Sequence, residues 1–389
     1  MLSDPLTAKP LFPNLRYLYC EYTMTATFLF RLPLPSLISL DINFKSPQSF
    51  RDFLESFPEL SSISRRLTLH MDHSDIAFSS FFSRSVYRWQ NLETLICPET
   101  TLDVDALVHL SRMSALSQLT FRLSATSQVS DSPLCFSDLN ESAVFSKDLH
   151  SISRLLSRSQ LPAITDFSAV VDSCPLREEL SSYLDSVRTS NADHTIENFT
   201  LDQSSPLPSN DVRSEALLLG LEDLRPYMTF RNLRRLELSV EWNVELTDSD
   251  LLVLASAWPH LEDLIINVNW GWNTVGGITP KGVLGLLQTC RSLRGFALAI
   301  DTQDCTESPP SELLASLGST LPPILFVDVL DSIIEVDSVP AIIAFFTAIT
   351  SHSKFAFSAW EGDGMVTSPS WEIYKDRWYD VYRCVIDAV

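Results

Sequence analysis

Apolar residues recur along this chain in short units with the spacing L-x-x-L-x-L. The clearest unit is "HLEDLII", in which Leu261, Leu264 and Ile266 occupy the apolar positions. Alternate residues of a strand point to the same face, so the last two apolar residues of a unit predict a strand with one buried face. The same spacing starts at Leu15, Leu37, Leu92, Leu116, Leu233, Leu293 and Ile324, and a shorter version occurs at Leu67 and Leu69.

The segments between these units have the period of amphipathic helices. "TDSDLLVLASAW" places Leu251 and Leu254 on one face and offers Thr247 or Asp248 as the residue that caps the helix N-terminus. "TPKGVLGLLQTC" repeats this pattern and has Pro280 in its first turn, where proline is favoured. The alternation therefore predicts a helix, a turn and a strand as one unit that is repeated.

A single unit cannot bury its apolar face alone, but stacked neighbours bury it together. The predicted fold is therefore an α/β leucine-rich-repeat solenoid, with a curved parallel sheet on the concave face and helices on the convex face. Four segments follow from repeat length: residues 1–123 with short repeats, 124–229 with degenerate repeats and Ser-rich loops, 230–369 with longer repeats, and 370–389 as a capping helix. Two Ser-rich stretches, 124–160 and 202–211, are predicted to be loops or disordered.

The C-terminal sequence "SPSWEIYKDRWYDVYRCVIDAV" predicts a helix with one apolar face. That face contains Trp371, Tyr374, Trp378, Val381 and Val385. Because the last unit of a stack exposes its apolar side, this helix is predicted to cap it. Docking of the helix to a partner or a membrane is the alternative.

Charge and composition narrow the choice of partners and compartments. The chain has 28 Lys and Arg against 49 Asp and Glu, a net charge of −21. This charge disfavours nucleic acid and anionic membranes and favours neutral or basic partners. No apolar stretch approaches the length of a membrane helix, and the N-terminus does not resemble a secretory signal. The seven cysteines are odd in number and widely spaced, which favours reduced thiols. We therefore predict a monomer of the cytoplasm or nucleus.

Few residues suggest catalytic chemistry. "HMDHSD" brings together His70, Asp72, His73 and Asp75, whose side chains can bind zinc or manganese. A third histidine at a suitable spacing is lacking, so a polar loop after a repeat strand is the preferred interpretation, and a metal-dependent enzyme is the alternative. "NWGWNTVGG" does not match a phosphate-binding loop, and no G-x-S-x-G occurs. We predict no catalytic, cofactor or metal residue, and no enzyme activity.

Three tryptophans follow the strands of the longer repeats. Trp242 and Trp270 stand at the same place after two successive strands, where they either cap the core or anchor a partner at the rim. Trp272 does not keep the parity of the row, which favours an exposed position.

The x residues of each L-x-x-L-x-L strand are expected to face the concave surface. The residues that this rule selects for protein binding are Arg235, Glu237, Glu241, Asp263, Ile265, Asn267, Asn269 and Asp301. Strands lie about 4.8 Å apart, so these side chains would form one acidic patch with an apolar centre at Ile265. The patch is predicted to bind a basic protein segment that carries an apolar anchor.

The longer repeats also point to a family. "LTDSDLLVLASAWPHLEDLII" and "GITPKGVLGLLQTCRSLRGFALAI" resemble the leucine-rich repeats of F-box proteins, and "LFPNLRYLYC" and "WQNLETLIC" are similar to the F-box families expanded in mushroom-forming fungi. The resemblance covers most of the chain and is strongest from about Phe230 to Asp301. It implies the substrate-binding part of a ubiquitin ligase receptor, whose F-box attaches it to a Skp-type adaptor and a cullin.

The F-box itself is not found, because the first repeat begins by Phe12. The adaptor and the cullin are therefore expected only if an F-box is supplied upstream. A leucine-rich-repeat scaffold with no role in ubiquitin transfer is the alternative.

Overall fold

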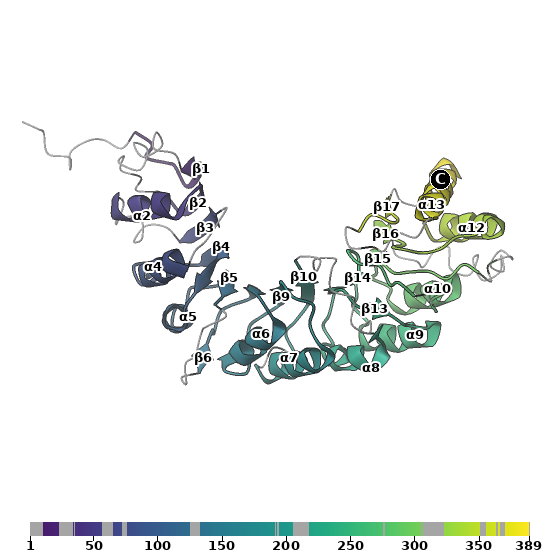
Figure 1. The fold of residues 1–389 in the computed structure, drawn as a ribbon, viewed down its shortest axis with the longest axis horizontal. Coiled ribbons are helices and arrows are strands. Elements are labelled where there is room, and N and C mark those ends of the chain that lie inside the picture. Colours follow the sequence, from purple (N-terminus) through teal and green to yellow (C-terminus); the bar gives the residue numbers. More distant parts are fainter. Residues whose placement is uncertain are drawn as a thin grey trace, which may run out of the picture. The chain divides into compact units, whose positions relative to one another are not determined.

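The computed structural model shows two compact units, each built around a parallel sheet with helices on one face (Figure 1). Unit 1 comprises Met1–Lys147, Ser151–Ile164 and Thr189–Ala192, and unit 2 comprises Asp148–His150, Thr165–Arg188 and Asp193–Val389. The structure describes residues 11–22, 34, 36–56, 65–71, 76–124, 133–190, 192, 194–204, 218–274, 277–303, 305, 323–350, 355–362, 365 and 370–388. The limits of these units are defined by the contacts within each unit, whereas the limits of the four predicted segments are defined by repeat length. The segment limits therefore stay predictions.

Unit 1 is a series of short strand and helix repeats. Its main sheet contains, in spatial order, β1 (Tyr17–Tyr22), β2 (Ser39–Phe44), β3 (Arg66–Met71), β4 (Thr94–Leu102), β5 (Gln118–Leu123) and β7 (Glu141–Ser146). Its other elements are α2 (Pro47–Ser56), α4 (Ile76–Val86), α5 (Val104–Ser111), most of α6 (Leu149–Leu156), and the small pair β6 (Leu134–Cys135) and β8 (Ser159–Gln160).

The apolar positions of successive repeats lie side by side in unit 1. The row at the fourth position of the motif consists of Leu18, Leu40, Leu67, Leu95 and Leu119. Of these, the four from β2 to β5 are at most 2% exposed. Each buried leucine contributes roughly 1.5–3 kcal/mol, so the row supplies a continuous core. The predicted strands and their register are confirmed here.

Unit 2 has longer connections but the same repeat plan. Its sheet order is β9 (Asp166–Val171), β10 (Asn198–Gln203), β12 (Arg235–Ser239), β14 (Asp263–Ile266), β15 (Gly295–Ala297), β16 (Phe326–Asp328) and β17 (Ala356–Ser358). A small pair joins β11 (Leu218–Leu219) and β13 (Asn243–Val244). The helices are α7 (Arg177–Thr189), α8 (Leu221–Leu224), η3 (Arg225–Thr229), α9 (Asp248–Ala257), α10 (Pro280–Thr289), η4 (Val336–Ser338), α12 (Val339–Thr350) and α13 (Trp371–Ala388).

Unit 2 has the same fourth-position row, in which phenylalanine often replaces leucine. It contains Phe167, Phe199, Leu236, Leu264, Phe296, Val327 and Phe357. Parallel strands with this repeated row and with helices on the buried side define an α/β leucine-rich-repeat solenoid, as the sequence predicts.

One part of the Ser-rich prediction is wrong. Within the stretch 124–160, residues 133–160 form strands and a helix, including β7 and α6. Ser142 takes the central leucine position of β7, lies opposite Leu119 and is 4% exposed. Because serine stands where the motif has leucine, the sequence pattern does not reveal this strand, which is otherwise regular. Residues 125–132 and 205–211 lie outside the described residues.

The predicted N-cap of α9 and the predicted proline in the first turn of α10 are confirmed. Thr247 forms a capping box with Asp250 at the start of α9, and Thr279 caps α10 with Pro280 in the first turn. Asp248 adds a link between these two repeats, because its Oδ1 accepts a hydrogen bond from Thr279 N and its Oδ2 accepts one from Thr279 Oγ1, both at 2.7 Å. The N-terminus of α10 is therefore held by a side chain of α9.

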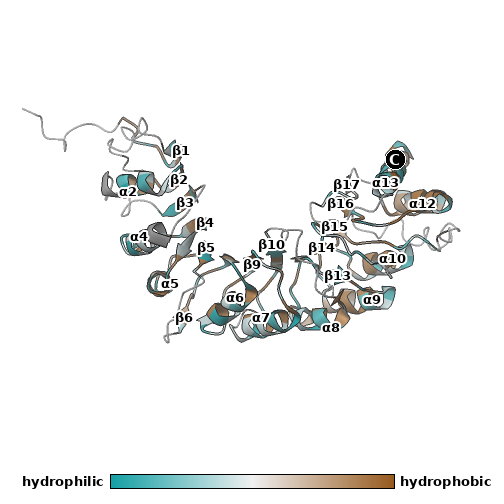
Figure 2. Cartoon of the chain, viewed as in Figure 1, coloured by the Kyte–Doolittle hydropathy of each residue, from teal (hydrophilic) through white to brown (hydrophobic). Residues whose placement is uncertain are grey.

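The last helix covers apolar residues of the final repeats. Trp378, Val381 and Val385 of α13 are buried, whereas Trp371 and Tyr374 are partly exposed. The Trp378 ring meets Phe346 of α12 edge-on at 6.1 Å, and its Nε1 donates to Ser332 O at 2.9 Å. Figure 2 shows α12 as a largely hydrophobic helix, in agreement with its sequence "VPAIIAFFTAIT". An unprotected α12 would expose this surface, and α13 covers part of it.

Candidate protein-binding surface

The face of the unit 2 sheet that points away from the core carries two polar rows. Asp166, Asn198, Arg235 and Asp263 lie side by side on β9, β10, β12 and β14. The next row contains Ser168, Thr200, Glu237 and Ile265. These residues alternate with the buried row, so they point to the opposite face. We call the part formed by β9, β10, β12 and β14 the open face.

Carboxylates outnumber cations on the open face. Arg235 contacts Glu237 through Nη2 at 2.8 Å and Asp263 through Nη1 at 3.6 Å. Asp202, at the end of β10, has a pKa raised by burial and then by the charge of Glu237. Burial also raises the pKa of Asp263, because the nearby Arg235 only partly offsets it. The Arg235 guanidinium is thus shared by two carboxylates, so negative charge exceeds positive charge on the open face.

The acidic character of the chain belongs to one unit. Unit 1 contains 14 Lys and Arg against 15 Asp and Glu, and unit 2 contains 14 against 34, so their formal net charges are −1 and −20. The electrostatic attraction for a basic partner is therefore concentrated in unit 2.

A ladder of opposite charges runs beside the open face, just before the strands begin. Arg234 contacts Glu197 at 3.1 Å and Glu262 at 2.6 Å, and Arg294 lies 3.8 Å from Glu262. These exposed pairs contribute little stability individually. They show, however, that Glu197 and Glu262 are matched in number by two arginines, whereas Glu237 and Asp263 on the open face share one.

The predicted binding residues separate into two groups. Arg235, Glu237 and Asp263 are partly exposed on the open face, as expected. Ile265 points to the same face but is only 7% exposed, so the predicted apolar centre is wrong. The remaining four residues, Glu241, Asn267, Asn269 and Asp301, lie in loops after the strands.

Hydrogen bonds fix two of these loops to residues of neighbouring strands. Asn269 donates from Nδ2 to Asp202 Oδ1 at 3.4 Å and from its backbone N to Ser239 Oγ at 3.3 Å. Glu241 donates its backbone N–H to Gln203 Oε1 at 3.0 Å. Asp301 Oδ1 accepts from Gln303 N at 2.9 Å, in the loop after β15.

Asn267 and Trp272 are structural residues, and the predictions that they are exposed are wrong. Asn267 is fully buried with a φ of 61°, and its side chain accepts from Val240 N at 3.1 Å and donates to Trp242 O at 2.7 Å. Trp272 is also fully buried and donates from Nε1 to Ile266 O at 3.0 Å. Trp242 and Trp270 are buried as well, which confirms their interpretation as core residues.

The surface predicted from the sequence omitted residues of β9 and β10, the two strands that precede β12 in the sheet. Asp166, Asn198 and Asp202 belong to repeats that read as degenerate, because phenylalanines stand where leucines are expected. The alternation in "NFTLDQ" would have placed Asn198 and Asp202 on the same face as Thr200.

The metal-like sequence is only partly described. His70 Nε2 lies 3.4 Å from Asp41 Oδ1 on the neighbouring strand, and Asp72, His73 and Asp75 lie outside the described residues. Within the described ranges, no three His, Cys, Asp or Glu side chains are placed to hold a metal ion together. Burial raises the pKa of the Cys290 thiol to about 12 and that of Cys20 to about 11, so both stay protonated at neutral pH.

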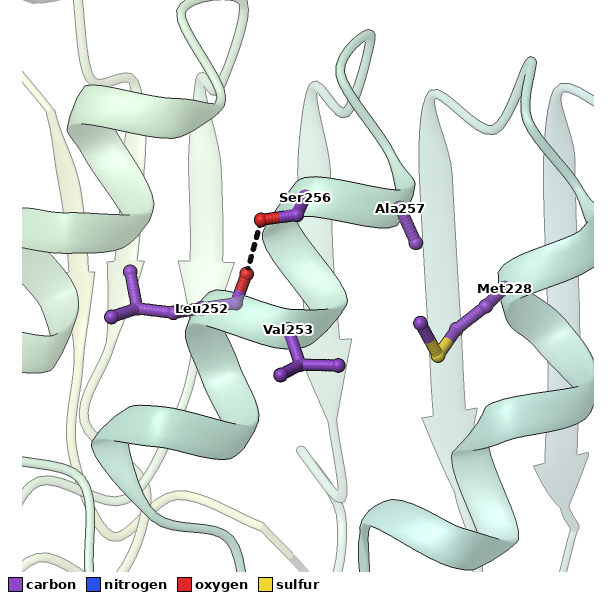
Figure 3. A pocket seen from close by; sticks show the side chains of 5 residues that line it. All are labelled: Met228, Leu252, Val253, Ser256 and Ala257. Carbon is purple, nitrogen blue, oxygen red and sulfur yellow. Dashed lines mark hydrogen bonds between the residues drawn. The ribbon is translucent and has the colours of Figure 1, made fainter.

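The helix side of unit 2 carries a shallow apolar groove between η3 and α9. Met228, Leu252, Val253, Ser256 and Ala257 line it, and Ser256 Oγ donates to Leu252 O at 2.8 Å (Figure 3). Leu252 and Val253 are 40% and 39% exposed. Among the helices that the structure describes, none has the length and apolar character needed to cross a bilayer.

Comparisons with known proteins add little. No protein-family model matches the chain, and no curated protein matches it. Among solved structures, an internalin (inlF) from Listeria monocytogenes matches with a TM-score of 0.43 and 12% identity, covering 88% of this chain and 86% of that one. The Rad7 and Elc1 complex from yeast matches with a TM-score of 0.36 and 11% identity, covering 88% and 81%. The fold assignment therefore depends on the strand register described above.

Proposed function

We propose that this chain is a non-enzymatic protein-binding module and that the open face of unit 2 holds a basic segment of the bound protein. The observation that supports this most is that Glu237 and Asp263 share the guanidinium of Arg235, while the charge of Glu237 also raises the pKa of Asp202 after burial does. A partner that supplies Lys or Arg would relieve the repulsion among these carboxylates. The net charge of −20 on unit 2 would mainly raise the association rate. Because Ile265 is buried, this basic segment needs no apolar anchor at that position.

The test compares two charge reversals of equal size. Once a partner is captured, Glu237→Arg with Asp263→Arg should weaken its binding by about tenfold or more at low salt, mostly through slower association. Glu178→Arg with Glu245→Arg changes the charge equally at exposed positions away from the open face and should have a much smaller effect. Equal weakening by both pairs, with folding intact by circular dichroism, would move the binding site elsewhere.

A finer proposal follows from the resemblance to F-box proteins. We propose that the bound protein is a ubiquitin ligase substrate, brought to a Skp-type adaptor and a cullin by an F-box supplied upstream. The alternative is a scaffold without a ubiquitin role. Affinity capture with mass spectrometry, with and without proteasome inhibition, separates the two. A receptor should recover the adaptor and gain bound substrate when the proteasome is inhibited, whereas a scaffold should show neither change.

A further inference from the structure

Exposed arginines line one edge of the unit 1 sheet, at the end where the strands begin. We call this edge the amino-end rim, and it consists of the first residues of the strands and the turns that lead into them. Its exposed arginines include Arg16, Arg65, Arg66, Arg88, Arg112 and Arg154. Because each helix runs antiparallel to the strand that follows it, helix C-termini and strand N-termini meet at this edge. The arginines therefore share the rim although they come from different element types.

Two of these arginines occupy equivalent positions in neighbouring repeats. Arg88 and Arg112 each stand four residues before the first leucine of a repeat, Leu92 and Leu116. Tyr87, beside Arg88, stacks on His109 in the last turn of α5 with ring centroids 4.8 Å apart. This contact joins the turn after α4 to the end of α5, where Arg112 is the C-cap residue.

Most of the rim arginines are not neutralised within the described part of the chain. Arg65 contacts Glu93 at 2.9 Å, and Arg66 lies 4.0 Å from it. Arg16, Arg88, Arg112 and Arg154 have no carboxylate within ion-pair distance among the described residues. Two other carboxylates, Asp138 and Glu141, are exposed on the same rim, and Glu141 accepts a hydrogen bond from Gln118. Among its described residues, the rim thus keeps a positive excess in a chain whose net charge is −21.

Helix stabilisation accounts for only part of this pattern. A cation near a helix C-terminus interacts favourably with the helix dipole, which explains Arg112 and Arg154. Arg16, Arg65 and Arg66 precede or begin strands, where no such dipole acts. Exposed guanidinium groups on several repeats of the same edge are better explained by an anionic partner that crosses those repeats.

We propose that the amino-end rim of unit 1 docks an acidic segment of a partner protein, independently of the open face of unit 2. Arginine suits carboxylates because its planar group can donate two parallel hydrogen bonds to one carboxylate. A short acidic peptide need contact only the rim, and charges beyond about 8 Å are largely screened at physiological salt. A long nucleic acid would extend beyond the rim, where the rest of unit 1 has more carboxylates than cations because the whole unit has a net charge of −1, so a peptide is favoured.

The experiment uses the full chain and a fluorescein-labelled decaglutamate peptide, with binding followed by fluorescence anisotropy at low salt. Arg88→Glu with Arg112→Glu should raise Kd by about tenfold, since each reversal replaces an attraction with a repulsion. Lys281→Glu with Arg383→Glu makes the same charge change at exposed positions of unit 2 and should change Kd less than twofold. Arg88→Ala with Arg112→Ala, a milder pair, should give an intermediate loss.

Several outcomes would overturn the proposal. One is that the wild-type chain does not bind the peptide, and another is that both reversed pairs weaken binding equally. A duplex DNA probe that binds more tightly than the peptide and loses affinity in the same rim variants would reassign the rim to nucleic acid. Melting curves of all variants, followed by circular dichroism, separate a loss of binding from a loss of folding.

Discussion

Gly282→Ala tests how closely α10 packs on α9. A Cβ atom built on Gly282 would lie 2.6 Å from Asp248 Cγ, well inside normal contact distance. Asp248 cannot retreat freely, because its carboxylate accepts two hydrogen bonds from Thr279 at the N-terminus of α10. The added methyl group would therefore displace Asp248 and break the link between the two repeats.

Two opposing effects decide whether Gly282→Ala raises or lowers the free energy of unfolding. Replacing glycine with alanine inside a helix stabilises it by up to about 1 kcal/mol. Each hydrogen bond to a charged acceptor contributes about 1.5–3 kcal/mol, and both bonds of Asp248 are at risk. The loss exceeds the gain even at the lower limit, so we expect Gly282→Ala to lower the free energy of unfolding by about 2 kcal/mol or more.

Gly285→Ala is the matched control on the same helix. Its Cβ atom would lie 2.6 Å from Leu252 Cδ2, the far end of a side chain that is 40% exposed and can rotate away. This variant should be neutral or more stable than the wild type. Urea unfolding followed by circular dichroism measures both variants. Equal stability of Gly282→Ala and Gly285→Ala would refute the reasoning.

A double-mutant cycle identifies the clash partner. Asp248→Ala removes the carboxylate and keeps only the Cβ atom, 3.1 Å from the added methyl group, so in that background Gly282→Ala should lose most of its destabilising effect. If Gly282→Ala remains destabilising without Asp248, another contact is responsible.

Three further substitutions test the core. Burial raises the pKa of Asp328 from 3.8 to about 6, so folding favours its protonated form; this contribution is complete below about pH 4 and is lost as the pH rises through 6. Asp328→Asn should therefore be more stable than the wild type at pH 7.5, by up to about 3 kcal/mol, and a difference that stays constant between pH 4 and 8 in urea titrations would contradict this. The buried Tyr227 hydroxyl has no hydrogen-bond partner among the described residues, so Tyr227→Phe should leave thermal stability unchanged or higher, and a loss above about 1 kcal/mol would reveal a missing partner. Leu264→Asp places a carboxylate at a fully buried position and should cost several kcal/mol, whereas an unchanged melting curve would contradict the strand register.

The repeat pattern predicted most of the fold, because a buried row requires apolar side chains at fixed spacing. The pattern failed where the buried row contains a residue other than leucine. Ser142 is small enough to be buried between larger neighbours, so β7 has no leucine signature at its centre. Phe167 and Phe199 fill the row as well as leucine does, but they made their repeats read as degenerate.

The open face was predictable only as far as the strands extend. Alternation placed Arg235, Glu237 and Asp263 correctly because all three lie within regular strands. β14 ends at Ile266, and Asn267 turns the chain with a φ of 61°, so side-chain parity no longer holds beyond it. Trp272 follows that turn and is buried for the same reason. The alternation of side chains does not specify where a strand ends, although the end of the strand decides where the loop residues point.

The two proposed surfaces differ in sign, and this makes them separable by experiment. Added salt weakens any exposed charge pair, so a loss of binding at high ionic strength would not distinguish the open face from the amino-end rim. Charge reversal does distinguish them, because Glu237→Arg should weaken a basic probe and leave decaglutamate unaffected, while Arg112→Glu should do the opposite. A single partner that requires both surfaces would lose affinity in both variants, and it would have to carry an acidic and a basic segment. Two partners, each sensitive to one variant, would indicate that the units bind independently.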